Sequence, residues 1–242
     1  MILAVNIGNT NIRAAVGNSD KIIAQTVVYA DEGMDKVKAN LSDTWDEIEG
    51  CLIATVVPQQ TKIVTKFLEE NKIKPIKRVD IKNCGELKTN KYEGLLGEDR
   101  VVCCARALQK FTAPFVVIDY GTATTINVVN SNKEFVGGAI LAGLQTNLDV
   151  LSKNTAQLPR IGVTGESVPL IGKNTVDNLL SGAIYGQASA TEGIINRMQE
   201  ELACKLPVIV TGGHGPYVLP YCRFEYTYEP TLLLDGLLAM YS

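Results

Sequence analysis

The chain has 242 residues, of which 23 are basic and 26 acidic, so its formal net charge is -3, and 46% of its residues are hydrophobic. This length fits one large domain or two small ones, and the near-neutral charge argues against a nucleic-acid-binding protein. No apolar run approaches the ~18 residues of a membrane span, and the first residues enter a strand-like run without a basic segment or a cleavage site. We therefore expect neither a membrane protein nor a signal peptide.

The cysteines and the single histidine limit the possible chemistry. No two cysteines form a C-x-x-C pair, which argues against a zinc ribbon or a thioredoxin-type motif. The one histidine, His214, excludes His-rich metal sites and catalysis that needs two imidazoles. Without a secretory signal a disulfide framework is not expected, so we predict reduced, mostly buried thiols in a cytoplasmic protein. The cysteines are Cys51, Cys84, Cys103, Cys104, Cys204 and Cys222.

The first half of the chain reads as three strands, a helix, a strand, a helix and a further strand. Cys51–Val57 is a continuous apolar run, which is typical of a strand buried on both faces. Val64, Phe67 and Leu68 recur at helical spacing, which predicts a helix with one buried side. The expected strands cover 2–5, 12–16, 21–29, 51–57 and 74–79, and the expected helices cover 34–45 and 61–71.

The second half repeats this plan, with strands expected at 115–118, 125–129, 135–140 and 208–210 and helices at 143–157, 176–203 and 232–241. A shift of 113 positions places Asn6-Ile7-Gly8-Asn9-Thr10 over Asp119-Tyr120-Gly121-Thr122-Ala123. Both segments read strand, amide or acid, glycine turn and strand, and such internal duplication is a strong fold signal. It predicts two similar α/β lobes that face one cleft, with domains at 1–113 and 114–242.

The two glycine turns could bind phosphate. A glycine at the bend lets backbone N–H groups approach an anion closely, and a carboxylate at the strand end can hold a cation beside it. One such turn is weak evidence, because Gly, Asn and Thr are common turn formers for local reasons. Two turns in corresponding positions favour a pair that clamps a polyphosphate.

Seven motifs, in this order along the chain, resemble those of the type III pantothenate kinases, a family of the actin/hexokinase-like ATPase superfamily. They are V-N-I-G-N-T-N-I at 5–12, A-T-V-V-P at 54–58, Y-E-G-L-L-G-E-D-R at 92–100, V-I-D-Y-G-T-A-T-T-I-N-V-V at 117–129, G-G-A-I-L-A-G-L at 137–144, I-G-K-N-T at 171–175 and T-G-G at 211–213. They span nearly the whole chain, and G-x-D-R together with D-x-G-T-A-T-T is a specific signature. The resemblance implies two similar ribonuclease H-like α/β lobes with the nucleotide cleft between them.

The resemblance also implies an activity, which is the ATP-dependent phosphorylation of pantothenate to 4′-phosphopantothenate, the first step of coenzyme A biosynthesis. It implies ATP as the phosphoryl donor, Mg²⁺, and a monovalent cation that is K⁺ or NH₄⁺. It further implies a homodimer whose pantothenate pocket uses both subunits, and we expect the dimer interface in the helix at 176–203. Neither a nucleic-acid partner nor a membrane partner is expected.

The family's site residues carry over motif by motif. Asp99 becomes the general base, and Asp119 becomes the ligand of the monovalent cation. The residues implied to bind the phosphates of ATP are Asn6, Ile7, Gly8, Asn9, Thr10, Asn11, Ile12, Arg13 and Thr122. The residues implied to bind pantothenate are Tyr92, Gly97, Glu98, Asp99, Arg100 and Thr175.

Simpler interpretations stand beside these roles. Taken alone, Asp99 could be a cap or first-turn acid that stabilises a helix, and Arg100 could form a surface ion pair, although the complete G-E-D-R context favours function. The segment Thr211–Gly213 could hold adenosine or be a plain turn from a strand to a helix, and the two interpretations stay open. His214 is expected to be a polar loop residue rather than a catalyst.

The chain departs from the family pattern in three places. Asn6 replaces an aspartate that helps to position magnesium, which should weaken divalent-cation binding because an amide lacks the negative charge. Ala142 replaces a proline, and the stretch before Gly97 is short. Two alternatives therefore stay open: a catalytically weak homologue that binds nucleotide or pantothenate as a regulatory protein, and a kinase for a sugar or small acid on the same fold, against which G-E-D-R argues.

Overall fold

The computed structural model describes residues 1–241, and this part of the chain falls into two compact units. The first unit comprises Met1–Thr112, Lys133–Val136 and the segment that begins at Thr231, and the second comprises Ala113–Asn132 and Gly137–Pro230. The division after Thr112 lies beside the predicted domain boundary. The units are nevertheless interleaved along the chain, whereas the sequence-based domains at 1–113 and 114–242 are continuous.

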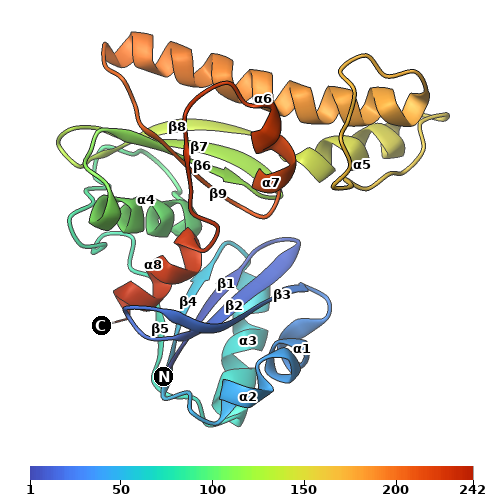
Figure 1. Ribbon diagram of the computed structural model, residues 1–242. Coiled ribbons are helices and arrows are strands. Elements are labelled where there is room, and N and C mark those ends of the chain that lie inside the picture. Colours follow the sequence, from blue (N-terminus) through green and yellow to red (C-terminus); the bar gives the residue numbers. More distant parts are fainter. Residues whose placement is uncertain (242) are drawn as a thin grey trace. The chain divides into compact units, whose positions relative to one another are not determined.

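The first unit contains a five-stranded mixed sheet in the order β3-β2-β1-β4-β5, visible in the lower part of Figure 1. Strand β1 runs antiparallel to β2 and parallel to β4, as expected when a hairpin is followed by a helical crossover. The strands are β1 (Ile2–Ile7), β2 (Asn11–Gly17), β3 (Ile22–Tyr29), β4 (Gly50–Thr55) and β5 (Ile76–Arg78). The helices are α1 (Gly33–Asn40), α2 (Ser42–Trp45), α3 (Pro58–Glu70), α4 (Glu98–Lys110) and α8 (Leu232–Met240).

The sheet of the first unit is covered by helices on both faces. Leu3, Val5 and Ile7 alternate along β1 and belong to one buried cluster with residues of α1, α2 and α3. On the other face α8 contacts β1, β2 and β4 and also packs against α4. The predicted helix at 34–45 is two short helices, because the backbone of Leu41 leaves the helical conformation with φ -110° and ψ 19°.

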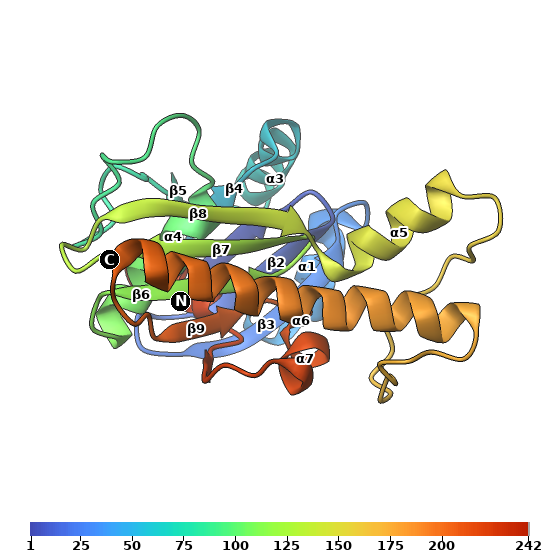
Figure 2. The ribbon, with the colours of Figure 1, turned by 90° about the horizontal axis from the view of Figure 1, so that it is seen from above.

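The second unit repeats the strand order of the first, as β10-β9-β6-β7-β8. Its strands are β6 (Phe115–Tyr120), β7 (Ala123–Val129), β8 (Phe135–Ala142), β9 (Val208–Thr211) and β10 (Thr227–Tyr228). The first two residues of β8, Phe135 and Val136, are grouped with the first unit. The helices of the second unit are α5 (Leu144–Asn154), α6 (Thr175–Leu202), α7 (Gly215–Val218) and the 3₁₀ helix η1 (Leu219–Tyr221). Figure 2 shows α6 running nearly along the direction of the strands of this sheet, with α5 beside the N-terminal half of α6.

The duplication predicted from the sequence is present, with one correction of its register. Strands β1 and β6 begin 113 positions apart, at Ile2 and Phe115, but β2 and β7 begin only 112 positions apart, at Asn11 and Ala123. Because three residues separate β1 from β2 and two separate β6 from β7, the second turn is one residue shorter. Ala123 therefore corresponds to Asn11 rather than to Thr10.

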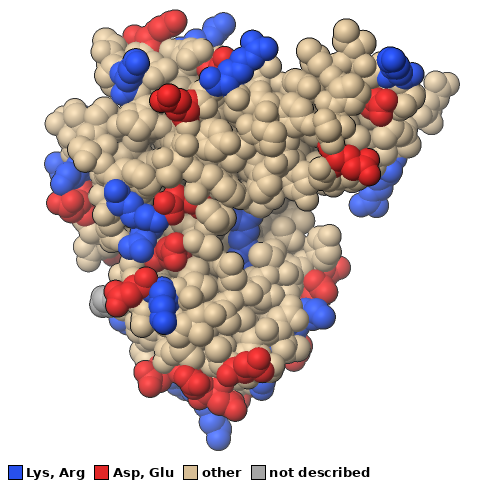
Figure 3. Space-filling view, in the orientation of Figure 1, with Lys and Arg blue, Asp and Glu red and all other residues tan. Residues whose placement is uncertain are grey.

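The charged side chains and the cysteine thiols of the described residues can be compared with what the composition predicts. Figure 3 shows basic and acidic side chains interspersed in scattered groups on a face that is mostly uncharged. All six cysteines are free, and four of them are buried. Burial raises the pKa of the Cys104 thiol to about 12 and that of Cys84 to about 11, where the nearby Asp80 carboxylate adds to the effect. Within residues 1–241, no helix is both long enough and apolar enough to cross a membrane.

Candidate active site

The G-E-D-R motif forms the first turn of α4. Gly97 is the N-cap residue with an extended backbone, and Glu98 and Asp99 are the acidic residues of the first helical turn. Acidic side chains are favoured there because the helix dipole places positive potential at the N-terminus. The Asp99 carboxylate accepts a hydrogen bond from the backbone N–H of Arg100 at 2.8 Å. The local contacts of Asp99 are therefore those of a helix-stabilising acid, and its half-buried carboxylate lies at the start of α4.

The Arg100 side chain lies against two aromatic rings. Its guanidinium carbon is 5.6 Å from the ring centroid of Tyr92 and 5.2 Å from that of Phe135, distances at which cation–π attraction acts. The two rings meet edge to face with 5.4 Å between centroids, and Arg100 Nη1 donates to the Tyr92 hydroxyl at 3.5 Å. Arg100 is only 8% exposed. This burial does not fit a surface ion pair, and it fixes the direction of the guanidinium.

Phe135 lies outside the motifs and is not among the predicted site residues. It opens β8 and is fully buried, and its backbone N–H donates to the carbonyl of Lys88 at 2.8 Å. In the sequence it is only an apolar strand residue, 35 positions from Arg100. A contact between residues so far apart carries no local spacing signal, so only the structure could show it.

Glu98 is bound on both carboxylate oxygens by its own unit. Oε2 accepts from the backbone N–H of Thr55 at 2.8 Å, and Oε1 pairs with Arg78 at 2.6 Å. Thr55 ends β4 and lies opposite Ile7, the last residue of β1. Glu98 thereby ties the start of α4 to the strand next to the first glycine turn. Its predicted contact with pantothenate stays a prediction.

The first glycine turn, Gly8–Thr10, connects β1 and β2. The N–H of Gly8 donates to the carbonyl of Asn11 at 3.0 Å, and the carbonyl of Thr10 accepts from the N–H of Ala30 at 2.9 Å. The side chains of Asn9 and Thr10 are exposed. The neighbouring isoleucines of both strands, Ile7 and Ile12, are buried in the core, so they can reach a phosphate only through their backbone.

Asn6 and Asp119 occupy equivalent places, each as the residue before the last in β1 and β6. Ile7 and Tyr120, their neighbours, belong to the clusters under the helices, so alternation directs Asn6 and Asp119 to the opposite face of their sheets. Asn6 is 8% exposed and lies opposite Arg13 of β2. Within residues 1–241, no group of three or more His, Cys, Asp or Glu side chains could hold a metal ion.

The second glycine turn consists of Gly121 and the exposed Thr122. Its carbonyl groups are bonded to donors of the second unit: Gly121 O to the ring of His214 at 3.2 Å, and Thr122 O to the Thr146 hydroxyl at 2.7 Å. The N–H of Gly143 also donates to Thr122 O, at 3.0 Å. His214 is thus a loop residue, as expected, but it contacts the turn directly.

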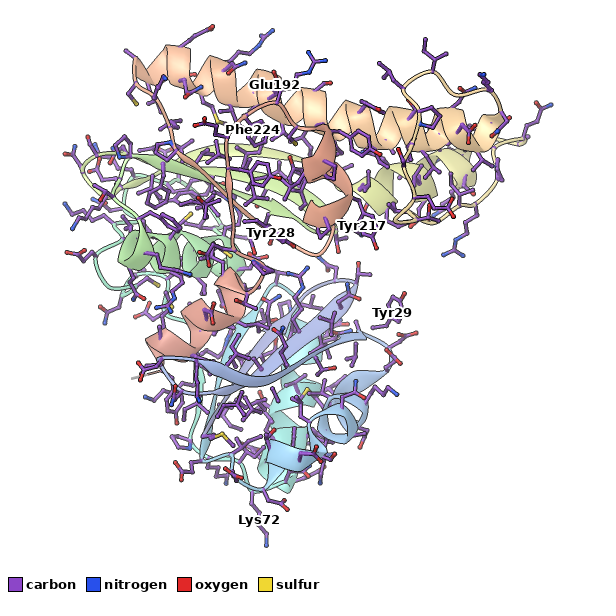
Figure 4. All side chains as sticks on the ribbon, in the orientation of Figure 1. Tyr29, Lys72, Glu192, Tyr217, Phe224 and Tyr228 are labelled. Atoms are coloured by element: carbon purple, nitrogen blue, oxygen red, sulfur yellow. The ribbon has the colours of Figure 1, made fainter. Side chains whose placement is uncertain are left out.

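The segment Thr211–Gly213 lies between β9 and α7. Gly212 has φ +98°, a left-handed conformation that favours glycine, and its carbonyl accepts from the Tyr228 hydroxyl at 3.2 Å. The ring of Tyr217 lies 6.2 Å from that of His214, the residue that follows the segment. Tyr217 and Tyr228 are labelled in Figure 4. The segment is a turn from a strand to a helix, and Tyr228 is bonded to it directly.

Thr175 is the first residue of α6 and is exposed, and the preceding Asn174 caps the helix by accepting from the N–H of Asp177. It belongs to the second unit, whereas Tyr92, Gly97, Asp99 and Arg100 belong to the first. The first unit therefore brings together most of the residues predicted to bind pantothenate.

Comparison with known proteins decides between the families that could use such a site. The model of the family described as "Type III pantothenate kinase" matches residues 2–197. The chain belongs to the type III pantothenate kinase family. A type III pantothenate kinase from Roseiflexus sp. (strain RS-1) is 32% identical over 253 residues, which cover 100% of this chain and 98% of that protein. Membership of the family makes the chain a pantothenate kinase, a phosphotransferase.

Solved structures with a similar fold agree with the duplicated sheets of a type III pantothenate kinase. An MreB 5 structure from Spiroplasma citri bound to AMPPNP has a TM-score of 0.53 at 12% identity and covers 97% of this chain and 94% of that one. Ta0583, an archaeal actin homolog in complex with ADP, has a TM-score of 0.52 at 15% identity and covers 99% and 97%. These likenesses confirm the α/β fold class of the chain.

Proposed function

We propose that this chain transfers the γ-phosphoryl group of ATP to the 4′-hydroxyl of pantothenate, the first step of coenzyme A biosynthesis. The observation that carries this proposal is the match to the type III pantothenate kinase family over residues 2–197. The geometry around α4 supports it, because a carboxylate and an oriented guanidinium follow each other at a helix start. No comparison favours the regulatory alternative.

In this reaction Asp99 acts as the general base. The carboxylate accepts the proton of the pantothenate hydroxyl while that oxygen forms a bond to the γ-phosphorus and the bond from the γ-phosphorus to ADP breaks. Phosphoryl transfer depends on positioning and charge compensation more than on covalent help from the protein. The Asp99 carboxylate meets the requirement for positioning, because its hydrogen bond with the backbone N–H of Arg100 holds it at the start of α4.

Pantothenate is an anion with a carboxylate, two hydroxyls and an amide. We propose that Tyr92, Gly97, Asp99 and Arg100 bind it, with Thr175 added from α6. Arg100 is suited to bind the pantothenate carboxylate, because a guanidinium can form two parallel hydrogen bonds with a carboxylate. The rings of Tyr92 and Phe135 already orient this guanidinium.

The phosphates of ATP are proposed to bind at the two glycine turns, to the segment Asn6–Arg13 and to Thr122. Asp119 supplies a carboxylate for a monovalent cation, and Asn6 supplies an amide oxygen near Mg²⁺. This donor set fits cations that bind together with the nucleotide, since Mg²⁺ usually keeps several waters and takes few protein ligands. When bound, the cations neutralise charge on the phosphates. The segment Thr211–Gly213, with Tyr217 and Tyr228 beside it, is proposed to hold adenosine.

We also propose a cytoplasmic homodimer formed through α6. An open groove of about 580 Å³ lies between α5 and α6 in the second unit, and its walls include Val150, Leu151, Gly182 and Gly186. A Cβ atom added at Gly182 or Gly186 would meet no atom of the described chain within 4 Å other than the neighbouring backbone of α6 itself. Glycine inside a helix costs about 0.5–1 kcal/mol relative to alanine, and packing within the chain does not explain that cost. Close approach of a second copy does.

The proposed activity is tested by the release of ADP. The purified chain is incubated with ATP, Mg²⁺ and K⁺, and ADP is measured with pantothenate, with glucose, and without an acceptor. We expect ADP release that requires pantothenate. Release that glucose supports equally would favour a sugar kinase, and release that needs no acceptor would mean ATP hydrolysis.

A further inference from the structure

Three successive carbonyl groups at the second glycine turn are bonded to donors of the second unit. The carbonyl of Tyr120 accepts from the backbone N–H of His214 at 2.9 Å, and that of Gly121 accepts from the ring of the same histidine at 3.2 Å. The carbonyl of Thr122 accepts from Gly143 N–H at 3.0 Å and from the Thr146 hydroxyl at 2.7 Å. Both side-chain donors come from outside the turn, from α5 and from the segment after β9.

These bonds fix the direction of the peptide planes. In a trans peptide the C=O and N–H groups point in opposite directions, so a carbonyl held on one side directs the next N–H to the other. The bond from His214 to Gly121 O therefore directs the N–H of Thr122 away from the histidine. The bond from Thr146 to Thr122 O likewise directs the N–H of Ala123 away from α5. Phosphate oxygens are attracted by N–H groups and repelled by carbonyl oxygens, so this orientation suits an anion.

The packing at the turn is close enough to hold the orientation. A Cβ atom on Gly143 would lie 2.2 Å from Gly121 O and 2.4 Å from Thr122 O, so only glycine lets α5 begin so near to the turn. In the first turn the carbonyls of Ile7 and Thr10 accept from the backbone N–H groups of Val56 and Ala30. Carbonyl groups of both turns thus accept hydrogen bonds from backbone N–H groups, and those of the second turn also accept from two side chains.

We propose that Thr146 and His214 are positioning residues for the nucleotide, because they hold the carbonyls of Gly121 and Thr122 away from the phosphates. His214 acts as a hydrogen-bond donor: a carbonyl oxygen only accepts, so Nδ1 must carry a proton. Neither side chain needs to touch ATP. The inference rests on the proposed role of the turn in phosphate binding.

Two matched pairs of variants test the proposal in the full chain. Thr146→Val removes the donor at nearly constant shape, and Thr146→Ser keeps it. His214→Leu removes the ring donor, and His214→Asn keeps an N–H near the position of Nδ1. For each variant we would measure the Kd for ADP by calorimetry without pantothenate, the KM for ATP and for pantothenate, kcat, and the melting temperature.

We expect Thr146→Val and His214→Leu each to raise the Kd for ADP and the KM for ATP about threefold to tenfold, the worth of one hydrogen bond. The KM for pantothenate should stay unchanged, and Thr146→Ser and His214→Asn should stay near the wild type. Equal Kd values in all four variants, or a fall in melting temperature alone, would overturn the proposal, as would a wild type that binds no ADP. If ADP binding follows the expectation while pantothenate is not phosphorylated, the proposed function fails and this inference stands.

Discussion

The guanidinium of Arg100 lies against the fully buried ring of Phe135, with 5.2 Å between the guanidinium carbon and the ring centroid. The two residues come from α4 and β8, and the loop before α4 is tied to β8 by hydrogen bonds in both directions between Lys88 and the segment Lys133–Phe135. The conformation of the arginine is therefore set before any substrate binds. Preorganisation of this kind reduces the entropy that is lost on binding.

Replacement of Phe135 by leucine should weaken pantothenate binding. Phe135→Leu keeps an apolar side chain in the core but removes the ring face under Arg100, and a cation–π contact contributes about 0.5–2 kcal/mol. We expect the KM for pantothenate to rise about 2- to 30-fold, with little change in the KM for ATP. Phe115→Leu, in the equally buried first residue of β6, is the matched control and should lower stability without changing the KM for pantothenate. A parallel response of the two variants would mean that Phe135 only fills the core.

Asp99→Asn should abolish most of the turnover while ATP still binds. The asparagine keeps an oxygen that can accept from the Arg100 N–H, so the start of α4 should survive, but an amide cannot take a proton from the hydroxyl. A general base contributes about 10²–10⁴-fold to the rate, so kcat should fall by that factor. Steady-state kinetics and calorimetry with ATP measure the two effects. Near-normal kcat would leave Asp99 with the helix-stabilising role alone.

The fold could be predicted from the sequence because its signals are local. Apolar runs located the strands of both sheets, helical spacing located α3, and the 113-residue repeat indicated the duplicated order. The break at Leu41 was missed because 34–45 keeps an apolar spacing across it. The two-residue strand β10 was missed because it is shorter than any recognisable pattern.

Only those site residues that belong to sequence motifs could be predicted from the sequence. Asp99 and Arg100 stand out because they are adjacent in a motif. The contact of Phe135 with Arg100 joins residues 35 positions apart, and that of His214 with Gly121 joins residues 93 positions apart. Contacts over such long separations leave no recognisable pattern in the sequence. Likewise the sequence motif did not show that the two carboxylate oxygens of Glu98 are bonded to Thr55 and Arg78, which lie on separate strands.

Asn6→Asp should lower the Mg²⁺ concentration that the reaction requires. The substitution adds a negative charge at nearly constant shape, on a strand position opposite Arg13, so packing should change little. A carboxylate is a stronger ligand than an amide for a hard dication. Titration of activity with Mg²⁺ at saturating ATP compares the two proteins. Identical titration curves would show that position 6 does not influence metal binding, and activity found only in the variant would point to a degenerate wild type.

Large side chains introduced on the exposed face of α6 should dissociate the proposed dimer into monomers. Gly182→Leu and Gly186→Leu place a branched side chain where a Cβ meets no atom of the described chain outside the neighbouring backbone of α6, so the monomer should fold normally. Light scattering at micromolar concentration should show a dimer for the wild type and a monomer for the variants. Gly182→Ala is the control, because one methyl group adds little bulk and improves helix propensity by about 0.5–1 kcal/mol. A wild-type monomer would refute the dimer and remove the shared role of Thr175.

The most direct test of the central claim follows the phosphoryl group itself. The purified chain is incubated with ATP labelled in the γ-phosphoryl group, pantothenate, Mg²⁺ and K⁺, and the products are identified by mass spectrometry. The account predicts labelled 4′-phosphopantothenate in equal amount to ADP, and loss of both products in Asp99→Asn. Label recovered as inorganic phosphate, or in no product while the folded wild type binds ATP, would contradict it.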